Sequence, residues 1–389
     1  MKIANRLQQI EPFHVMDLLA KAKHMASQGR DIIHLEVGEP DFPSPDAVVQ
    51  AGQSALEQGL THYTPAVGIP ELRQAISAFY QSRYGEEVSA DRIVITPGAS
   101  GALQLITSLL VNPGENLLLT DPGYPCNRHF LANINGQGQM VPTRAQDGYH
   151  LTPELVDQNW SASSVGALVA SPANPTGAVM APQDIQALYH AVHRKGGVFI
   201  MDEIYHGLTY GMDASTAVNL GEDCFVINSF SKYFAMTGWR LGWLVAPEWA
   251  VPHLDKLAQN LFLAPSTPAQ YAALALFDKA CIAQLERRRE EFAKRLAFLL
   301  PALRELGFLV PAEPQGAFYI YADISELGHE HSQDSMRFCL DLLEQTGLAI
   351  TPGIDFGHQH GHHFVRFAYT SDIPVLQDAI TRLKIYLKK

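Results

Sequence analysis

The sequence has few cysteines, no excess of basic residues and no long apolar run. The four cysteines are Cys126, Cys224, Cys281 and Cys339. They lie far apart and form no CxxC pair, which indicates reduced structural thiols rather than disulfides or zinc ligands. The 28 Lys and Arg against 40 Asp and Glu give a net charge of −12. Without a basic cluster, a nucleic-acid partner is not expected.

Membrane insertion and export are not expected either. Nowhere do about 18 apolar residues run together, as a membrane-spanning helix would require. Glu11 and Pro12 interrupt the N-terminal stretch where a signal peptide would need its apolar run. We therefore expect a cytoplasmic protein.

The sequence does have enough hydrophobic residues to form a large core. Hydrophobic residues make up 47% and charged residues 17% of 389 positions, which predicts two domains in one chain. We expect residues 1–45 to join a small domain, 46–280 to form a large ligand-binding domain, and 281–389 to form the small C-terminal domain.

The middle of the chain alternates short apolar stretches with helical ones such as Pro182–Arg194. The predicted strands are Asn116–Thr120, Gly166–Ala170, Gly197–Met201, Cys224–Asn228 and Leu241–Ala246. This alternation predicts βαβ units, and hence an α/β fold with a mostly parallel sheet covered by helices. The C-terminal third has alternating strands and helices that are typical of a smaller α+β domain. One helical pattern runs from Pro268 towards Leu306, where Pro301 should end or bend it.

The strand that ends at Asn228 leads into a segment with reactive side chains. Lys232 follows it, Arg240 lies eight residues further on, and Ser229 precedes the lysine. A lysine at the rim of a sheet can form a Schiff base if its amine is easily deprotonated. The arginine and the serine can bind a phosphate. These are the requirements of pyridoxal phosphate (PLP), although a solvated loop lysine fits the local pattern equally well.

Other predicted strands also end in polar or aromatic residues, at the edge where parallel sheets bind ligands. Asp202 could keep the ring nitrogen of PLP protonated. Tyr205 and Asn174 could donate to its phenolic oxygen, and Tyr124 could stack on its ring. Each residue has an ordinary alternative: Asn174 could belong to a turn and Asp202 could cap a helix. The coincidence of all these strand ends favours the cofactor.

A turn of small residues follows the predicted strand Arg92–Thr96 and precedes the predicted helix Ala102–Val111. Its members are Gly98, Ala99 and Ser100. Backbone N–H groups at such a turn can bind an anion, so we expect the phosphate there. The turn has neither the dinucleotide fingerprint nor the P-loop spacing, and by itself it could be ordinary strand-to-helix packing.

Together these segments resemble the class I/II aminotransferases of the fold-type I PLP-dependent enzymes. The matching segments, in family order, are Gly38–Phe42, His62–Pro65, Thr96–Gly98, Asp121–Pro125, Asn174–Gly177, Asp202–Tyr205, Ser229–Lys232, Thr237–Arg240 and Phe364–Phe367. They extend from about residue 30 to 370. Jointly they are specific for PLP, whereas individually only the lysine segment is.

The resemblance implies more than the local patterns do. It implies that Arg366 binds the substrate α-carboxylate, with help from the backbone of Gly38 and from Asn174. It implies that Tyr63 reaches the cofactor phosphate of a neighbouring subunit, so that the active site belongs to a homodimer. It also implies that Lys232 acts as general base and acid in transamination between an L-amino acid and a 2-oxo acid.

Two other functions share some of these features. A PLP-dependent carbon–sulfur β-lyase would use every residue named above, and a non-enzymatic PLP-sensing regulator would need an additional DNA-binding module. The substrate side-chain pocket has no sequence signature. The segment Phe13–Met16 could line an apolar pocket or could serve packing alone.

One loop invites a metal interpretation. It contains His358, His360, His362 and His363, but no carboxylate or cysteine accompanies them there, so we predict no metal site.

Overall fold

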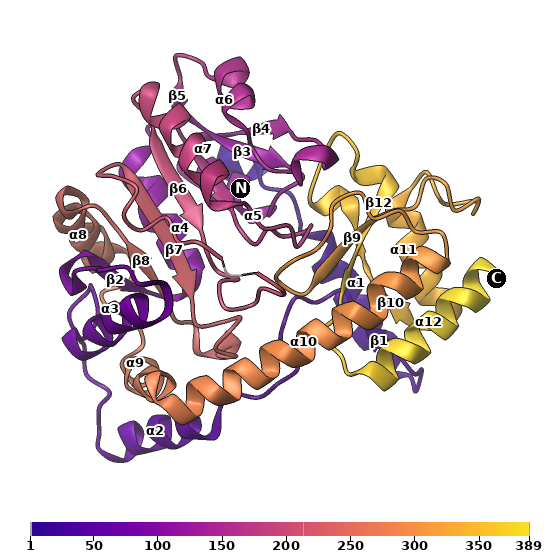
Figure 1. Ribbon diagram of the computed structural model, residues 1–389, viewed down its shortest axis with the longest axis horizontal. Coiled ribbons are helices and arrows are strands. Elements are labelled where there is room, and N and C mark those ends of the chain that lie inside the picture. The colour runs from indigo at the N-terminus through magenta and orange to yellow at the C-terminus, as the bar shows by residue number, and fades with distance from the viewer. Residues whose placement is uncertain (1, 213, 389) are drawn as a thin grey trace.

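The computed structural model describes residues 2–212 and 214–388. Its largest sheet has the strand order β2-β8-β7-β6-β5-β3-β4 (Figure 1). The strands are β2 (Ile93–Thr96), β3 (Asn116–Asp121), β4 (Gln137–Pro142), β5 (Ser164–Ala170), β6 (Val198–Asp202), β7 (Cys224–Ser229) and β8 (Gly242–Val245). Neighbours from β4 to β7 are parallel, and β8 runs antiparallel to both β7 and β2. The predicted mostly parallel α/β sheet is thus confirmed.

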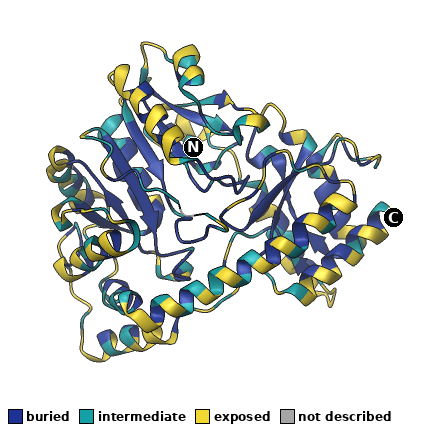
Figure 2. Ribbon diagram, viewed as in Figure 1, coloured by how far each residue is buried: buried dark blue, intermediate teal, exposed yellow. Residues whose placement is uncertain are grey.

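Helices cover both faces of this sheet. They are α2 (Asp46–Glu57), α3 (Pro70–Tyr84), α4 (Gly98–Leu110), α5 (Cys126–Asn133), α6 (Pro153–Asn159), α7 (Pro182–Arg194), α8 (Val251–Leu261) and α9 (Thr267–Leu274). Successive residues of a strand point to opposite faces. In β7, Phe225 and Ile227 pack into the cluster under α4 and α8, whereas Cys224 and Val226 join the cluster that includes α7. Figure 2 shows the central strands as almost wholly buried.

A second group of elements lies beside the sheet, at the right of Figure 1. It contains α1 (His14–Ser27), β1 (Ile33–His34), α10 (Lys279–Glu305), β9 (Tyr319–Asp323), α11 (Ser335–Thr346), β10 (Leu348–Ala349), β11 (Thr351–Pro352), β12 (Phe364–Ala368) and α12 (Ile373–Leu387). The strands β11, β12 and β9 form an antiparallel sheet. Strand β1 pairs in parallel with β10, so the N-terminal segment lies against the C-terminal part of the chain. The three domain boundaries themselves stay a prediction.

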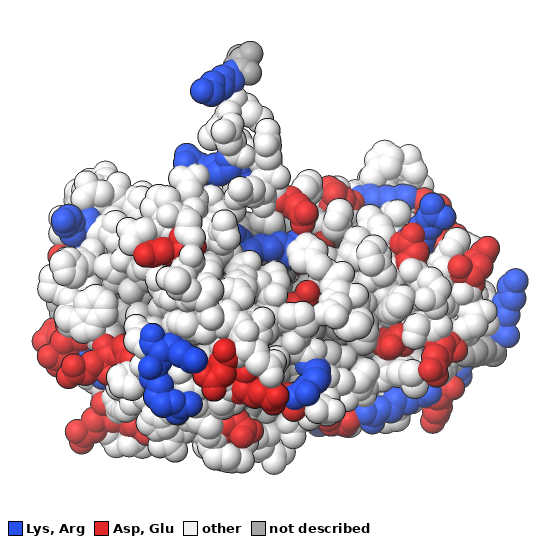
Figure 3. Space-filling model, turned by 90° about the horizontal axis from the view of Figure 1, so that it is seen from above, with Lys and Arg blue, Asp and Glu red and all other residues white. Residues whose placement is uncertain are grey.

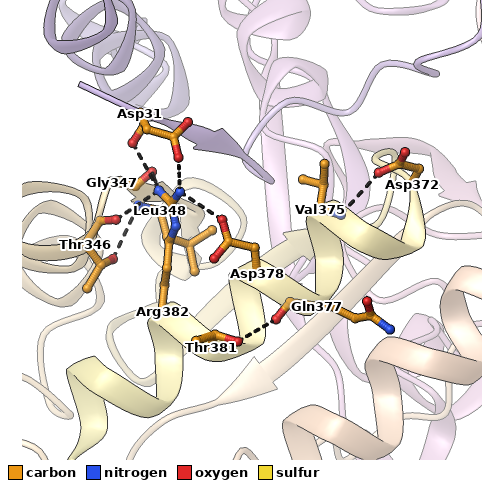
Figure 4. Close-up of polar contacts among 10 residues, drawn as sticks. All are labelled: Asp31, Thr346, Gly347, Leu348, Asp372, Val375, Gln377, Asp378, Thr381 and Arg382. Carbon is orange, nitrogen blue, oxygen red and sulfur yellow. Dashed lines mark hydrogen bonds and ion pairs between the residues drawn. The ribbon is translucent and has the colours of Figure 1, made fainter. Parts of the chain in front are cut away.

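Arg382 of α12 strengthens that junction (Figure 4). Its guanidinium donates to the backbone oxygens of Asp31 and Thr346, both at 3.0 Å, and pairs with the carboxylates of Asp31 and Asp378. One side chain therefore joins the start of β1, the end of α11 and its own helix.

The elements differ from the predicted ones at three places. The edge strand β4 has the mixed sequence Gln137–Pro142, which lacks the apolar run that marked the other strands. The pattern from Pro268 divides into α9 and α10, and α10 continues through Pro301. Pro301 and Ala297 are both exposed, so the carbonyl that the proline leaves free can face water. Helix α4 begins at Gly98 rather than Ala102.

The surface carries mixed charge. On the face shown in Figure 3, Lys and Arg lie among Asp and Glu without forming a continuous basic area. Among the described residues, no helix has the length and apolar character needed to cross a membrane.

Candidate active site

A cavity of about 340 Å³ lies at the carboxyl ends of the parallel strands, where they face the second group of elements. The predicted site residues that line it are Gly38, Ala99, Ser100, Tyr124, Asn174, Asp202, Tyr205, Ser229, Lys232, Arg240 and Arg366. Residues far apart in the sequence are thus brought to one place, because the strands end at the same edge of the sheet.

Lys232 lies in the loop after β7, and the amine end of its side chain is buried. Its Nζ donates a hydrogen bond of 2.6 Å to the backbone oxygen of Gly38. Burial, followed by the positive charge of Arg366, lowers the pKa of Lys232 to about 8, although Glu39 opposes this. A lysine with such a pKa is a better nucleophile and base near neutral pH than an exposed one.

Asp202 ends β6, and its carboxylate is buried. Oδ1 accepts a 3.0 Å hydrogen bond from the backbone N–H of Ile204. Burial raises the pKa of Asp202 to about 6, while this hydrogen bond and the charge of Lys232 act in the other direction. A cation placed against the carboxylate would restore its ionised form.

Two tyrosines meet beside the lysine. The hydroxyl oxygens of Tyr205 and Tyr319 are 2.8 Å apart, and Lys232 Nζ lies 5.9 Å from the centroid of the Tyr205 ring. A Cβ at Gly38 would lie only 1.8 Å from the Tyr319 hydroxyl, so a side chain here would displace Tyr319. Burial raises the pKa of Tyr205 well above its usual range, which keeps its hydroxyl protonated and able to donate.

The opposite end of the cavity is suited to an anion. Ala99 and Ser100 belong to the first turn of α4, where backbone N–H groups have no partner within the helix. Gly98 has a positive φ of 71°, and a Cβ on it would lie 2.5 Å from Arg240 Nη2. Because Gly98 has no side chain, the Arg240 guanidinium can lie beside the turn. The Ser229 hydroxyl lies 3.0 Å from that of Ser231.

Arg366 stands in the middle of β12, between two aromatic rings. Its guanidinium carbon lies 4.2 Å from the ring centroid of Tyr319 and 4.7 Å from that of Phe356. Nη1 donates to Asn174 Oδ1 at 2.9 Å, and Nη2 donates to the backbone oxygen of Glu36 at 2.6 Å. Nε is buried without a hydrogen-bond partner among the described residues. A buried, unpaired charged donor is costly, so the arrangement favours an acidic ligand here.

Tyr63 does not reach this cavity within the chain. Its side chain is 83% exposed, in the loop between α2 and α3. The predicted role in a neighbouring subunit requires such exposure and stays a prediction.

Several cavity residues were not predicted. They are Glu36, Glu39, Leu103, Ile204, Ser231, Thr237 and Tyr319. Ser231 could have been inferred, because it lies between Ser229 and Lys232 in the same loop. Glu36 and Tyr319 sit in strands where no local pattern distinguishes a cavity residue from a packing residue. In the described ranges 2–212 and 214–388, no group of three His, Cys, Asp or Glu side chains could hold a metal ion.

The residues present fit PLP. One cavity contains a buried carboxylate that forms no ion pair with the described residues, two hydroxyls in contact, a lysine with a lowered pKa, and a helix start beside an arginine. The carboxylate suits a protonated ring nitrogen, and the helix start suits a phosphate.

Comparisons with known proteins agree with this fit. The family described as aminotransferase class I and II matches residues 30–383. A valine–pyruvate aminotransferase of Mycobacterium tuberculosis is 37% identical over 381 residues, which cover 97% of each chain. A (5-formylfuran-3-yl)methyl phosphate transaminase of Methanocaldococcus jannaschii is 34% identical over the whole of both chains. The crystal structure of an aminotransferase from Mycobacterium tuberculosis superposes with a TM-score of 0.94 at 35% identity, over 100% of this chain and 99% of the other.

Proposed function

As a member of the class I and II aminotransferase family, this chain is a PLP-dependent aminotransferase, and we propose that Lys232 is its catalytic amine. We further propose that it moves the α-amino group of an L-amino acid to a 2-oxo acid. The observation that carries the proposal is the cavity itself, in which Lys232, Asp202 and Arg366 meet. When bound, PLP supplies an aldehyde that condenses with amines and a ring that withdraws electrons from the substrate α-carbon.

Lys232 moves the proton in this proposal. With a pKa of about 8, its Nζ is readily deprotonated near neutral pH and can take the proton from the substrate α-carbon. With PLP bound, the same amine would also be the group that returns the proton during transamination. The carbonyl of Gly38, which accepts from Nζ at 2.6 Å, holds the amine inside the cavity.

The cofactor would be held at three points. Asp202 would pair with the ring nitrogen, while Tyr205 and Asn174 would donate to the phenolic oxygen. Tyr124 would stack on the ring. The phosphate ligands would be Gly98, Ala99, Ser100, Ser229 and Arg240. Asn174, Asp202, Tyr205 and Ser229 are buried, which strengthens their interactions, whereas Ser100 and Arg240 are exposed at the phosphate end.

The substrate would be oriented by its α-carboxylate. The position of Arg366 on the cavity wall supports a role as the carboxylate ligand, together with the backbone of Gly38 and the side chain of Asn174. The rings of Tyr319 and Phe356 both pack against the guanidinium and restrict its motion. A fixed guanidinium sets the angle at which the α-carbon meets Lys232.

We also propose that the enzyme is a homodimer in which Tyr63 contributes to the partner's phosphate site, and the exposure of Tyr63 supports this. Four unpaired thiols support a reducing, cytoplasmic setting.

The test of the proposal is Lys232→Ala, with Lys195→Ala as the matched control. Lys195 pairs with Asp157 on the surface, away from the cavity. Each protein is loaded with PLP and mixed with single L-amino acids, and the loss of visible cofactor absorbance is followed. Lys232→Ala should slow this half-reaction by at least about a thousandfold, since it removes the acid–base group. Lys195→Ala should leave it unchanged. Near-normal turnover by Lys232→Ala would overturn the assignment.

A further inference from the structure

Helix α1 begins without a capping side chain of its own. Its N-cap residue is Phe13, and no side chain within the helix start accepts from its first N–H groups. Asp355, which lies 341 residues after His14 in the chain, accepts from these N–H groups instead. Its two carboxylate oxygens accept from the backbone N–H groups of His14 at 3.0 Å and Val15 at 2.9 Å. The cap of α1 is thus supplied by a distant segment, and Asp355 is itself buried.

The segment that carries Asp355 is fixed to the rest of the site. Phe356, the next residue, packs on the guanidinium of Arg366. Its backbone oxygen accepts a 2.8 Å hydrogen bond from the N–H of Gly123, at the end of β3. Asp121 in turn accepts from the N–H of His358 at 3.1 Å. Asp355 therefore holds α1 at a defined place relative to both the sheet edge and Arg366.

The capped end of α1 forms part of the cavity wall. Phe13, Val15 and Met16 all line the cavity that contains Lys232 and Arg366. Val15 is buried, whereas Met16 is 56% exposed and lies at the rim. These three side chains are apolar and carry no hydrogen-bonding group, so this wall favours an apolar ligand.

The charged side chains on the other walls of the cavity also disfavour a ligand with a second carboxylate. Among the described residues that line the cavity, the Lys and Arg side chains are Lys232, Arg240 and Arg366. Each of them has a role in the proposed reaction, so none of the described cations that line the cavity within this chain is left for a second carboxylate. Glu36 and Glu39 also line the cavity and would repel a second carboxylate on the substrate.

We propose that Asp355 is a positioning residue that, by capping α1, holds Phe13, Val15 and Met16 as the wall for the substrate side chain and so favours amino acids with apolar side chains. This inference rests on the proposed transamination. Alanine, whose methyl group is too short to use the wall fully, serves as an internal reference. The preference for leucine over alanine measures how well the wall is positioned.

The experiment measures kcat/KM of the amino-acid half-reaction for L-leucine, L-alanine, L-aspartate and L-lysine, using the PLP-loaded enzyme. The wild type should use leucine at least about tenfold better than aspartate, because Glu36 and Glu39 repel a second carboxylate. Leucine should also be preferred over lysine, because the apolar wall offers the lysine ammonium no hydrogen-bond partner. Asp355→Ala should lower the leucine-to-alanine ratio about five- to thirtyfold, the factor that corresponds to loss of a helix cap. Its cofactor absorbance should stay normal. Asp355→Asn retains an acceptor oxygen and should restore most of the ratio.

A matched control exists in the same part of the molecule. Asp372 caps α12 by accepting from the N–H of Val375 at 3.2 Å, and it does not line the cavity (Figure 4). Asp372→Ala should cost stability as Asp355→Ala does, yet leave the leucine-to-alanine ratio unchanged. An unchanged ratio in Asp355→Ala would overturn the positioning role. A wild-type preference for aspartate or lysine over leucine would overturn the apolar wall and leave transamination standing. Failure of the proposed function itself would be recognised separately, by half-reaction activity in Lys232→Ala.

Discussion

Arg366 and Asn174 join the two sides of the cavity through one hydrogen bond, in which Nη1 donates to Oδ1 at 2.9 Å. Arg366 comes from the small antiparallel sheet, and Asn174 comes from the loop after β5. Nη2 of the same guanidinium donates to the backbone oxygen of Glu36 at 2.6 Å, so both contacts hold the arginine at the cavity wall. Asn174 is also a proposed cofactor ligand, so one amide would contact both the substrate arginine and the cofactor, with its Oδ1 used by Arg366 and its Nδ2 left for the cofactor.

This coupling predicts the effect of Arg366→Lys. A lysine keeps the charge but cannot donate to Asn174 and to a carboxylate with one planar group. We expect the KM for the amino acid to rise at least about thirtyfold, since loss of a buried charged hydrogen bond costs about 2–5 kcal/mol. Spectrophotometric titration with PLP should show cofactor affinity within about threefold of the wild type.

The control for this variant is Arg295→Lys. Arg295 is also buried and forms a two-point contact with Asp41, at 2.8 and 2.9 Å, but it lies outside the cavity. Its replacement should lower the midpoint of thermal unfolding and leave the KM unchanged. If Arg366→Lys instead lost the cofactor at normal KM, the arginine would belong to the cofactor site.

The role of Asp202 can be tested with Asp202→Asn, and the neighbouring carboxylate Glu203 supplies the control variant. Asp202→Asn keeps the acceptor for the Ile204 N–H but removes the charge proposed to face the ring nitrogen. We expect PLP to bind more than about a hundredfold more weakly, since breaking a buried charge pair costs about 3–5 kcal/mol. Glu203 accepts from Ala217 N–H and Thr216 instead, and burial raises its pKa to about 8. Glu203→Gln should therefore bind PLP normally at pH 7, and equal losses in both variants would contradict the role of Asp202.

Lys232 should make the stability of the cofactor-free protein depend on pH. Its pKa is 10.5 in the unfolded chain and about 8 when folded, so between these values the unfolded state binds more protons. Stability should therefore rise with pH from about 8 to 10.5, and below 8 the full cost of the buried charge remains. That cost is about 3 kcal/mol, and Lys232→Met should recover it at pH 7. In urea unfolding the gap between variant and wild type should narrow to about 1 kcal/mol at pH 10. A constant gap would mean that folding does not lower the pKa of Lys232.

Strand ends were the part of the site that sequence predicted best. Asp202, Tyr205 and Asn174 each follow an apolar run, and parallel strands bring their ends to one edge whatever the loops between them do. The mostly parallel sheet followed from the same alternation. The start of α4 was predicted four residues late, because Gly98 is a poor helix former even though its backbone can occupy the first turn.

Contacts between distant segments could not be predicted in this way. Tyr319 meets Tyr205 across 114 positions, and Asp355 caps α1 across 341. Tyr319 lies in a strand whose residues are otherwise packing, and nothing in its neighbourhood marks its hydroxyl as part of a cavity. Asp355 precedes a phenylalanine in a short turn, a context typical of any surface loop. Only the fold reveals what these side chains contact.

The shared active site can be tested by mixing two inactive variants. If Tyr63 serves the partner's cofactor, a dimer of Tyr63→Ala with Lys232→Ala has one site with both residues intact and one with neither. Each variant alone should be nearly inactive at limiting PLP, because one lacks the amine and the other lacks a phosphate donor. After denaturation together at equal concentration and refolding, about half of the dimers are mixed and activity should reach about a quarter of wild type. If Tyr63 acted only within its own chain, mixing would restore nothing, since no site would then contain both residues. Co-refolding Lys232→Ala with Tyr233→Phe supplies the comparison: Tyr233 bonds Glu286 inside its own chain, so the activity of that mixture should depend only on the intact Lys232 it contributes.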